Sequence, residues 1–248
     1  MDNLNNKKIL ISGVGKGLGK EIMLDCLNQG AVVYGFTRSV KDIENLKIKN
    51  MNKLRIFIGD ANDQKFINKM FYFFKKKNIK LNALVNNAGI TQRKNFLEIS
   101  SKNLKDVMDT NFIAPFFLTQ KFIKQLSKRS PGSIVNIGSI VGEKPFKQLT
   151  GYASAKSALS AMTKSLSLEL LDNNYKVRIN CINPGFTKTS YFQKFSKNRK
   201  LYSWTLKNIS LKRWADSSEI SKLAIFLLSE KSSYITGEII SIDGGWKY

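Results

Sequence analysis

Seven short apolar runs recur along the chain, and longer segments with helical spacing separate them. The runs are rich in Ile, Val, Leu and Phe and have the length of buried strands. Strands that alternate with helices predict a parallel sheet with helices packed on both of its faces. The runs occupy residues 8–12, 31–37, 54–59, 81–86, 133–137, 177–183 and 238–242.

Two of the intervening segments predict the main helices, at about residues 101–127 and about residues 152–171. Right-handed crossovers between the strands then give a doubly wound, seven-stranded parallel α/β sheet. No Pro-, Gly- or Ser-rich linker interrupts the sequence, so we expect one domain over residues 1–248. The alternation breaks at about residues 186–214, where aromatic and basic residues follow a strand. We interpret this insertion as a substrate lid.

The composition adds a strongly basic surface, because 41 Lys and Arg residues face 18 Asp and Glu and give a net charge of +23. Such a charge raises nucleic acid or an anionic membrane as partner. The excess is almost all lysine and is spread along the chain, whereas Arg, the better reader of bases and phosphates, numbers seven. No helix-turn-helix, zinc or RNA-binding signature appears. We therefore interpret the charge mainly as a compositional bias, and non-specific polyanion binding stays open.

Absent and isolated residue types narrow the chemistry. The chain has no His, which excludes a Ser-His-Asp triad, a His-ligated metal and a His general base. Cys26 and Cys181 stand singly in helix-like and strand-like runs, so we expect neither a disulfide nor a metal site. No run approaches the ~18 apolar residues of a membrane-spanning helix, and the first residues lack the apolar core of a signal peptide. A soluble, cytoplasmic protein is expected.

A serine at a strand end and a Tyr-x-x-x-Lys pair follow one another between Ser139 and Lys156. Residues four apart share a helix face, so the Lys156 ammonium can lie beneath the Tyr152 phenol. A nearby cation lowers the pKa of a phenol from its reference near ~10, which suits proton transfer at neutral pH. The same spacing recurs at Tyr72 and Lys76 in a Phe- and Lys-rich stretch, which we interpret as an amphipathic helix.

A glycine-rich loop directly follows the first strand and opens a helix. Glycines let backbone N–H groups approach a pyrophosphate, and the helix N-terminus adds partial positive charge, so the loop predicts dinucleotide binding. The second strand ends at Thr37 and Arg38 with no carboxylate, and Lys16 can converge with Arg38 on a 2′-phosphate. NADP(H) is therefore favoured over NAD(H). The loop consists of Ser12, Gly13, Val14, Gly15, Lys16, Gly17, Leu18 and Gly19.

In this order the motifs resemble the single-domain short-chain dehydrogenase/reductase family, nearly end to end. The resemblance implies a Rossmann-type fold, a homo-dimer or homo-tetramer, and hydride transfer between NADP(H) and a carbonyl or secondary alcohol. It implies a catalytic tetrad of Asn111, Ser139, Tyr152 and Lys156. Besides the loop, Thr37, Arg38, Tyr152 and Lys156, the implied cofactor contacts are Asp60, Ala61, Asn87, Ala88, Gly89, Pro184, Gly185 and Thr187.

The resemblance also implies a role for each member of the tetrad. Ser139 would hydrogen-bond the substrate oxygen and stabilise charge developing there. Tyr152 would give a proton to that oxygen in reduction or take one in oxidation. Lys156 would hold the nicotinamide ribose and lower the pKa of Tyr152. Asn111 would anchor a water that passes protons to Lys156.

Two segments address the substrate and point in different directions. Residues 216–237 resemble 3-oxoacyl-acyl-carrier-protein reductases, and residues 128–129 fall where those enzymes meet an acidic carrier protein. The second basic position expected of them reads Asn-Asn, at residues 173–174. Residues 86–98 instead resemble gluconate 5-dehydrogenases and related sugar-acid reductases, in which Arg93 could pair with a substrate carboxylate.

The predicted lid interleaves aromatic with basic side chains. This mixture suits an anionic substrate with an apolar or sugar body, and it suits equally a plain amphipathic helix pair packed on the domain. A function of another class, a cofactor-binding protein that acts on polyanions through its basic surface, also stays open. The lid residues are Tyr191, Phe192, Phe195, Tyr202 and Trp204, with Lys188, Lys194, Lys197, Arg199 and Lys200.

Overall fold

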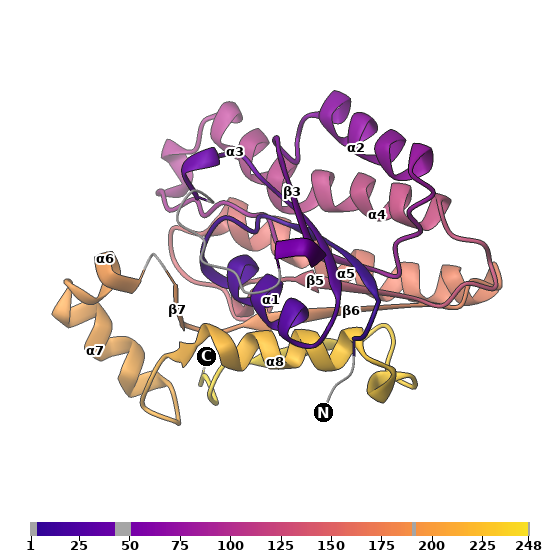
Figure 1. The fold of residues 1–248 in the computed structure, drawn as a ribbon. Coiled ribbons are helices and arrows are strands. Elements are labelled where there is room, and N and C mark those ends of the chain that lie inside the picture. The colour runs from indigo at the N-terminus through magenta and orange to yellow at the C-terminus, as the bar shows by residue number, and fades with distance from the viewer. Residues whose placement is uncertain (1–3, 43–50, 190–191, 248) are drawn as a thin grey trace.

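A seven-stranded parallel sheet organises the chain, in the order β3-β2-β1-β4-β5-β6-β9 (Figure 1). The computed structural model describes residues 4–42, 51–189 and 192–247. All seven predicted strands are confirmed, with ends that shift by at most two residues. The strands are β1 (Lys8–Ser12), β2 (Val32–Thr37), β3 (Leu54–Ile58), β4 (Ala83–Asn86), β5 (Gly132–Ile137), β6 (Val177–Pro184) and β9 (Ile239–Ile242).

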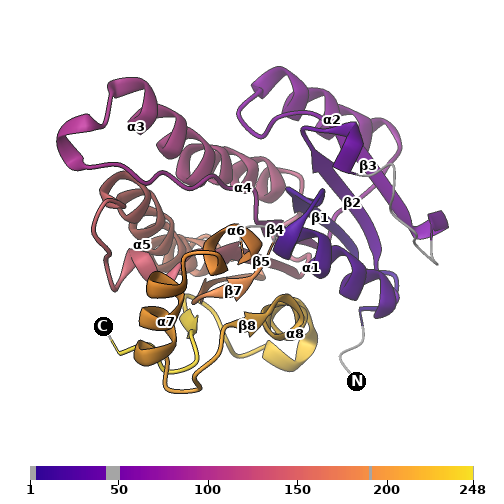
Figure 2. The same cartoon turned by 90° about the vertical axis from the view of Figure 1, so that its left-hand side faces the viewer.

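Helices cover both faces of the sheet, as the Rossmann-type prediction requires (Figures 1 and 2). Alternate residues of a strand point to opposite faces. Ile9 and Ile11 therefore pack toward α1 and α8, whereas Leu10 packs toward α2 and α4. The order of the strands reverses between β1 and β4, which is where ligands of such sheets bind. The helices are α1 (Gly17–Asn28), α2 (Gln64–Lys76), α4 (Ala114–Lys124), α5 (Thr150–Asp172) and α8 (Ser217–Leu228).

The second Tyr-x-x-x-Lys copy lies on α2, as expected for an amphipathic helix. Tyr72 is 66% exposed, while Phe74 on the opposite side is buried in the core. This copy therefore belongs to the packing of the sheet.

The prediction of one continuous helix over residues 101–127 is wrong. Helix α3 (Ser101–Met108) passes through a π-helical turn at Asp109–Ile113 before α4 begins. Pro115 has no N–H to donate to the carbonyl of Asn111, and the Asn111 side chain itself donates to the Val107 carbonyl at 2.9 Å. Both features disfavour α-helical hydrogen bonds at this turn, which buries Asn111 completely.

The predicted lid segment contains two short strands and two helices: β7 (Thr187–Lys188), α6 (Phe192–Ser196), α7 (Arg199–Asn208) and β8 (Ala215–Asp216). Strand β7 pairs with β8, apart from the main sheet. The segment lies at the left of Figure 1 and faces the viewer in Figure 2. Its apolar side packs into a third hydrophobic cluster, around Trp214 and Trp246. The prediction that an amphipathic helix pair packs on the domain is therefore confirmed.

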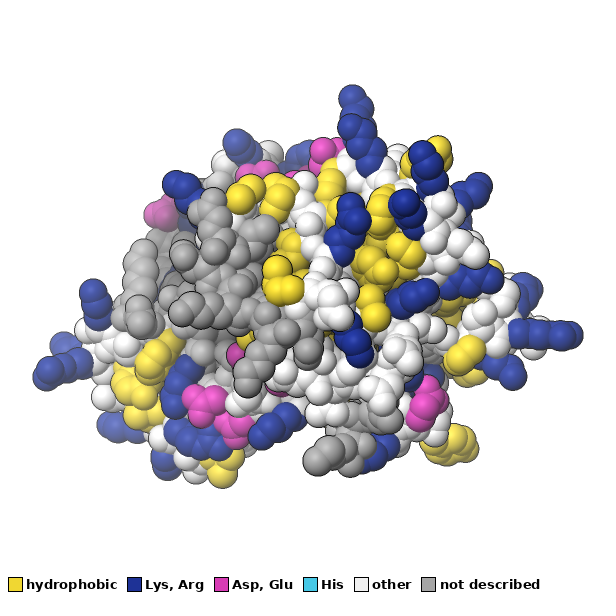
Figure 3. Space-filling model, in the orientation of Figure 1, with side chains coloured by type: hydrophobic (Ala, Val, Ile, Leu, Met, Phe, Trp, Pro, Cys, Tyr) yellow, Lys and Arg dark blue, Asp and Glu magenta, His cyan; other side chains and the backbone are white. Residues whose placement is uncertain are grey.

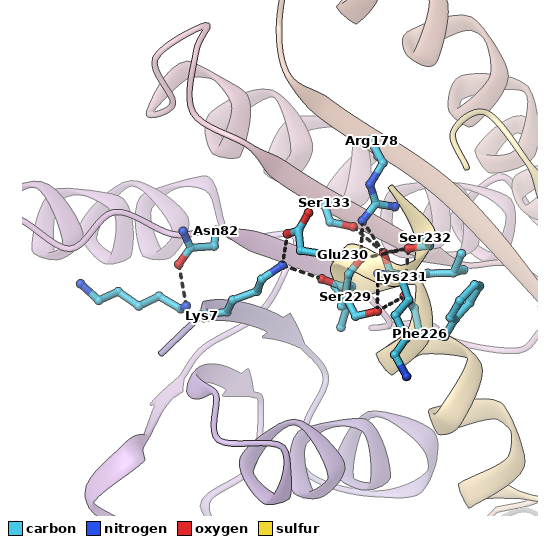
Figure 4. A network of polar contacts seen from close by, with 12 residues as sticks. Lys7, Asn82, Ser133, Arg178, Phe226, Ser229, Glu230, Lys231 and Ser232 are labelled. Carbon is cyan, nitrogen blue, oxygen red and sulfur yellow. Dashed lines mark hydrogen bonds and ion pairs between the residues drawn. The ribbon is translucent and has the colours of Figure 1, made fainter. Parts of the chain in front are cut away.

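Two cations at the amino-terminal ends of the strands fasten the sheet to the end of α8 (Figure 4). The Arg178 guanidinium on β6 donates to the carbonyls of Leu227 and Ser229, both at 3.0 Å. Lys7, just before β1, donates to the Leu228 carbonyl at 3.2 Å and pairs with Glu230 at 2.6 Å. The last carbonyls of a helix lack partners within the helix, so these donors stabilise its end.

The charged side chains do not gather into one stripe on the face drawn in Figure 3, where Lys and Arg stand scattered around the whole outline. Cys26 and Cys181 are free and buried. Among the described residues, no helix combines the length and the apolarity needed to cross a membrane. That part of the chain also contains no group of three or more Cys, Asp and Glu that could hold a metal ion.

Candidate active site

Ser139 and Tyr152 meet where β5 ends. Ser139 leaves β5 and caps a 3₁₀ turn at Ile140–Gly142, with its Oγ accepting the Val141 N–H at 3.3 Å. Tyr152 lies in the first turn of α5, and its side chain lines the same cavity as that of Ser139. The turn at 140–142 packs closely on α5, because a Cβ on Gly142 would lie 3.2 Å from the backbone of Lys156. Glycine at this position therefore allows the serine and the tyrosine to approach.

Lys156 lies one helical turn beyond Tyr152 and is 4% exposed. Its Nζ donates to the Ile137 carbonyl at 2.7 Å and lies 5.9 Å from the centre of the Tyr152 ring. Burial lowers the pKa of the Lys156 ammonium to about 8, with the nearby Cys181 acting in the opposite direction. The Lys156 ammonium therefore lies against the Tyr152 ring, as predicted, and the Ile137 carbonyl holds it there.

The pKa of Tyr152 shifts in the direction opposite to the one expected. Burial raises the pKa of the phenol, and the hydrogen bond from Ser139 offsets this only in part. Removing a phenolate from water is costly, and the ammonium of Lys156 lies over the ring rather than at the hydroxyl. Tyr152 therefore keeps its proton at neutral pH, which suits a proton donor.

Asn111 lies in the π-helical turn beside the segment that follows β4. Its Nδ2 donates to the carbonyls of Ile90 and Val107, both at 2.9 Å, and its Oδ1 accepts the Ile90 N–H at 3.3 Å. A Cβ on Gly89 would lie 2.8 Å from the Asn111 Oδ1 and 3.8 Å from the Lys156 Nζ. Glycine at 89 therefore keeps the space between the two polar groups open.

A cavity of about 350 Å³ lies beside the glycine loop and gathers most of the predicted cofactor residues. The backbone there suits phosphates, because Gly13 has φ +72° and a Cβ on it would lie 2.9 Å from the Ala88 Cα. The first turn of α1 contains no acidic residue, and its N-cap residue Lys16 makes no side-chain hydrogen bond to it. The backbone N–H groups of the glycine loop and of the first turn of α1 fit the pyrophosphate of a dinucleotide. The predicted residues lining the cavity are Gly13, Gly15, Lys16, Thr37, Arg38, Asp60, Ala61, Asn87, Ala88 and Gly89.

The other predicted cofactor residues lie around this cavity rather than in its lining. Gly17, Leu18 and Gly19 form the first turn of α1, where a Cβ on Gly19 would lie 2.2 Å from the Gly13 carbonyl oxygen. Pro184, Gly185 and Thr187 line a second cavity together with Ser139 and Tyr152.

The structure adds one carboxylate that the sequence interpretation missed. Asp42 ends a 3₁₀ turn at Val40–Asp42 and lines the cavity beside the glycine loop. The end of β2 has no carboxylate, as the sequence showed, but the turn after β2 carries Asp42 back to Thr37, whose hydroxyl donates to it at 3.4 Å. Inspection of the residues at the strand end alone could not reveal it.

The second cavity, of about 590 Å³, has mainly apolar and aromatic walls. Arg93 lines it, and its Nε donates to the Gln148 Oε1 at 3.1 Å. Lys147 is a further cation of the lining. Of the aromatic wall residues, the sequence analysis named Phe195 and Trp204 as lid residues. Phe186 and Trp214 are the two ends of the same predicted lid segment, whereas Phe146 comes from the loop before α5. The aromatic wall consists of Phe146, Phe186, Phe195, Trp204 and Trp214.

One predicted feature, the basic pair at residues 128–129, does not join this site. These residues precede β5, whereas Ser139 follows it, and a six-residue strand separates its ends by roughly 20 Å. Lys128 instead lies over the Tyr175 ring at 5.7 Å. Tyr191, expected to contact substrate, lies outside the described residues.

A set of buried Ser139 and Lys156 with half-buried Tyr152, beside a glycine loop that fits a dinucleotide, defines a nicotinamide-dependent oxidoreductase. The family model described as enoyl-(acyl carrier protein) reductase matches residues 13–247. The chain belongs to the short-chain dehydrogenase/reductase family.

Curated relatives and solved structures cover almost the whole chain. The 3-oxoacyl-[acyl-carrier-protein] reductases FabG of Chlamydia muridarum and Buchnera aphidicola are 33% and 32% identical to it over 246 and 245 residues, with 98% of each chain covered. An Agrobacterium tumefaciens protein assigned as a gluconate dehydrogenase is 27% identical with a TM-score of 0.93, covering 98% of this chain and 96% of its own. A 4-hydroxyisoleucine dehydrogenase complexed with NADH is 28% identical with a TM-score of 0.91, covering 97% and 98%.

Proposed function

We propose that the protein is an NADPH-dependent carbonyl reductase, with a 3-oxoacyl thioester as its substrate. The observation that carries the proposal is that the hydroxyl side chains of Ser139 and Tyr152 lie together in the lining of an apolar cavity of about 590 Å³. A carbonyl that reaches both hydroxyls has its oxygen beside a protonated phenol. An apolar body attached to it lies against the aromatic walls.

The residues divide the reaction between them. Ser139 donates a hydrogen bond to the substrate oxygen and stabilises its developing negative charge. Tyr152, whose pKa burial raises, gives its proton to that oxygen. Lys156 supplies positive charge under the phenol, and Asn111 lies across Gly89 from it, in a position to anchor a proton-carrying water. A bound nicotinamide dinucleotide supplies the hydride.

Arg38 and Lys16 support NADPH as that dinucleotide. Both cations line the cavity beside the glycine loop, next to the end of β2, where a 2′-phosphate is recognised in such folds. The loop, Asp60, Ala61 and residues 87–89 hold the rest of the dinucleotide, while Pro184, Gly185 and Thr187 border its reactive end.

The walls of the second cavity favour an acyl chain over a sugar acid. A sugar acid presents several hydroxyls, each of which needs a partner when it leaves water. The aromatic side chains around Phe186 and Trp204 offer apolar surface instead. Arg93 and Lys147 complement an anionic group at the end of the substrate, such as the phosphate of a thioester carrier. Segment 186–214 then acts as the lid, with Phe195 and Trp204 contacting the substrate.

An acyl carrier protein is the proposed macromolecular partner. Lys128 and Arg129 lie about a strand length from Ser139 of the same chain, so a carrier docked on them would not reach this active site directly. We also propose a homo-oligomer, supported by exposed apolar side chains on α4 and α5. These are Phe116, Phe117, Leu168 and Leu171. The scattered charge gives less support to polyanion binding as the main function.

An NADPH-consumption screen with matched tyrosine variants tests the function. The screen compares 3-oxoacyl thioesters, keto sugar acids and small ketones. Tyr152→Phe is expected to keep cofactor binding and to lose ~10²-fold or more in turnover. Tyr72→Phe, which alters the same spacing on the exposed side of α2, is expected to change nothing. Unchanged turnover in Tyr152→Phe would refute the mechanism, and preference for keto sugar acids would refute the substrate.

A further inference from the structure

Asp42 lies at the part of the cofactor cavity that distinguishes NADPH from NADH. A Cβ on Gly15 would lie 2.6 Å from the Asp42 Oδ2 and 2.7 Å from the Thr37 Oγ1. The carboxylate of Asp42 therefore lies directly against the backbone of the glycine loop. Its contact with Thr37 fixes it beside the end of β2, where the ribose 2′ position is recognised.

Among the described residues that line this cavity, the charges balance. Two cations, Lys16 and Arg38, accompany two carboxylates, Asp42 and Asp60. The Arg38 guanidinium already lies 3.8 Å from the Asp60 carboxylate. This balance in the described part of the lining contrasts with the +23 of the whole chain, and the two carboxylates offset part of the attraction of Lys16 and Arg38 for a 2′-phosphate.

The two groups nearest the end of β2 also differ in depth. The Arg38 side chain is 67% exposed, whereas Asp42 is half-buried. Water and salt screen an exposed charge more strongly than a half-buried one. The repulsion between Asp42 and a phosphate is therefore weakened less by solvent than the attraction of Arg38.

We propose that Asp42 is a specificity-determining residue that limits the preference for NADPH and allows NADH to be used as well. Its carboxylate accepts hydrogen bonds from the hydroxyls of an unphosphorylated ribose and repels a 2′-phosphate. Selectivity at this site is then set by a repulsive group as much as by an attractive one. The inference rests on the proposed function, since it presupposes a nicotinamide dinucleotide in this cavity.

Calorimetric titration of the full-length protein with NADPH and with NADH tests Asp42 without relying on turnover. In Asp42→Asn, the ratio of the NADH dissociation constant to that of NADPH is expected to rise about tenfold, mainly because NADPH binds more tightly. Asp172→Asn removes the same charge from the exposed end of α5 and is expected to change the ratio less than about twofold. If Asp42→Asn does not fold, Asp42→Ser replaces it.

Failure of the inference is distinguishable from failure of the proposed function. A ratio that rises less than about fivefold in the Asp42 variant, or equally in Asp172→Asn, would overturn the role of Asp42. Arg38→Ser, by contrast, is expected to lower the ratio by weakening NADPH. If the wild-type protein binds neither nucleotide, the proposed function itself is wrong.

Discussion

Asn183 holds the backbone of Ser139: its Oδ1 accepts the Ser139 N–H at 3.1 Å. The same oxygen lies so close to Gly138 that a Cβ there would be 2.0 Å away, which explains the glycine before the serine. The thiol of Cys181 also donates to it, at 3.5 Å. Asn183 is completely buried, and β6 fixes it. It is therefore a positioning residue for Ser139.

Replacing Asn183 with Ala is expected to lower kcat about tenfold with little change in KM, because Ser139 loses the acceptor that orients its backbone. If Asn183 acts through Ser139, the same replacement in a Ser139→Ala background lowers kcat less than about twofold further. Steady-state kinetics on the four proteins measures this cycle. Additive losses in the double variant would contradict the role.

Asn180 on the same strand supplies a matched control for this cycle. It is buried too, but it bonds to Ile235 and Glu238, away from Ser139. Asn180→Ala is therefore expected to reduce stability and to leave kcat of the folded protein unchanged.

The pH dependence of carbonyl reduction follows from the two shifted groups. Tyr152 must carry its proton, and burial keeps it protonated by raising its pKa. Lys156 is a cation below its pKa of about 8 and loses this charge above it, so kcat/KM is expected to stay level up to about pH 8 and to decline above. In Lys156→Arg the decline should move to higher pH, since Arg keeps its charge. A pH–rate profile identical in both proteins would contradict this assignment.

The sequence predicted the fold well because its signals are local. Strands that are buried on both faces read as apolar runs, and a glycine loop after the first run fixes where a helix begins. The sequence predicted one helix over 101–127 and did not reveal the π-helical turn inside it. That turn depends on which carbonyls the Asn111 side chain binds. That information is tertiary.

The site was predictable to the extent that chemistry lies in short motifs. Ser139, Tyr152 and Lys156 come together because one strand end and one helix turn place them. Asp42 and Asn183 were missed, since the first returns through a turn and the second acts from a neighbouring strand. The pKa of Tyr152 was misjudged because burial, which a sequence does not display, outweighs the nearby cation.

The aromatic wall should control the length of the accepted acyl chain. Trp204 lines the cavity and makes edge-to-face contacts with Phe146 and Trp246, with ring centres 6.2 and 5.5 Å apart. Trp204→Ala is expected to raise KM about tenfold for a medium-chain 3-oxoacyl thioester, and far less for 3-oxobutanoyl, because each buried methylene contributes about 0.8 kcal/mol. Tyr234→Ala, at a fully exposed position, serves as the control. An equal rise in KM for both thioesters would mean that the acyl chain does not lie against Trp204.

The contacts between Arg178, near the start of β6, and the end of α8 should govern stability without affecting catalysis. Arg178→Ala removes the guanidinium donor from the carbonyls of Leu227 and Ser229, which keep only hydroxyl donors from Ser133 and Ser232. The change is expected to lower the free energy of unfolding by about 1–3 kcal/mol. Urea unfolding measures the loss, and Arg199→Ala at the exposed start of α7 should cost much less. The contacts are drawn in Figure 4. Equal stability of Arg178→Ala and wild type would show that the network contributes nothing.

The exposed apolar side chains of α4 and α5 should determine the oligomeric state. Phe117 on α4 is 41% exposed and Leu168 on α5 is 66% exposed, and burial of such surface against a second copy removes it from water. Phe117→Asp would place a charge in that interface, so it is expected to shift a wild-type oligomer toward the monomer in sedimentation velocity. Leu211→Asp is the control, because it also replaces an exposed apolar side chain, 62% exposed and located after α7. It is expected to keep the oligomer. If Phe117→Asp assembles over the same concentration range as the wild type, another surface joins the subunits.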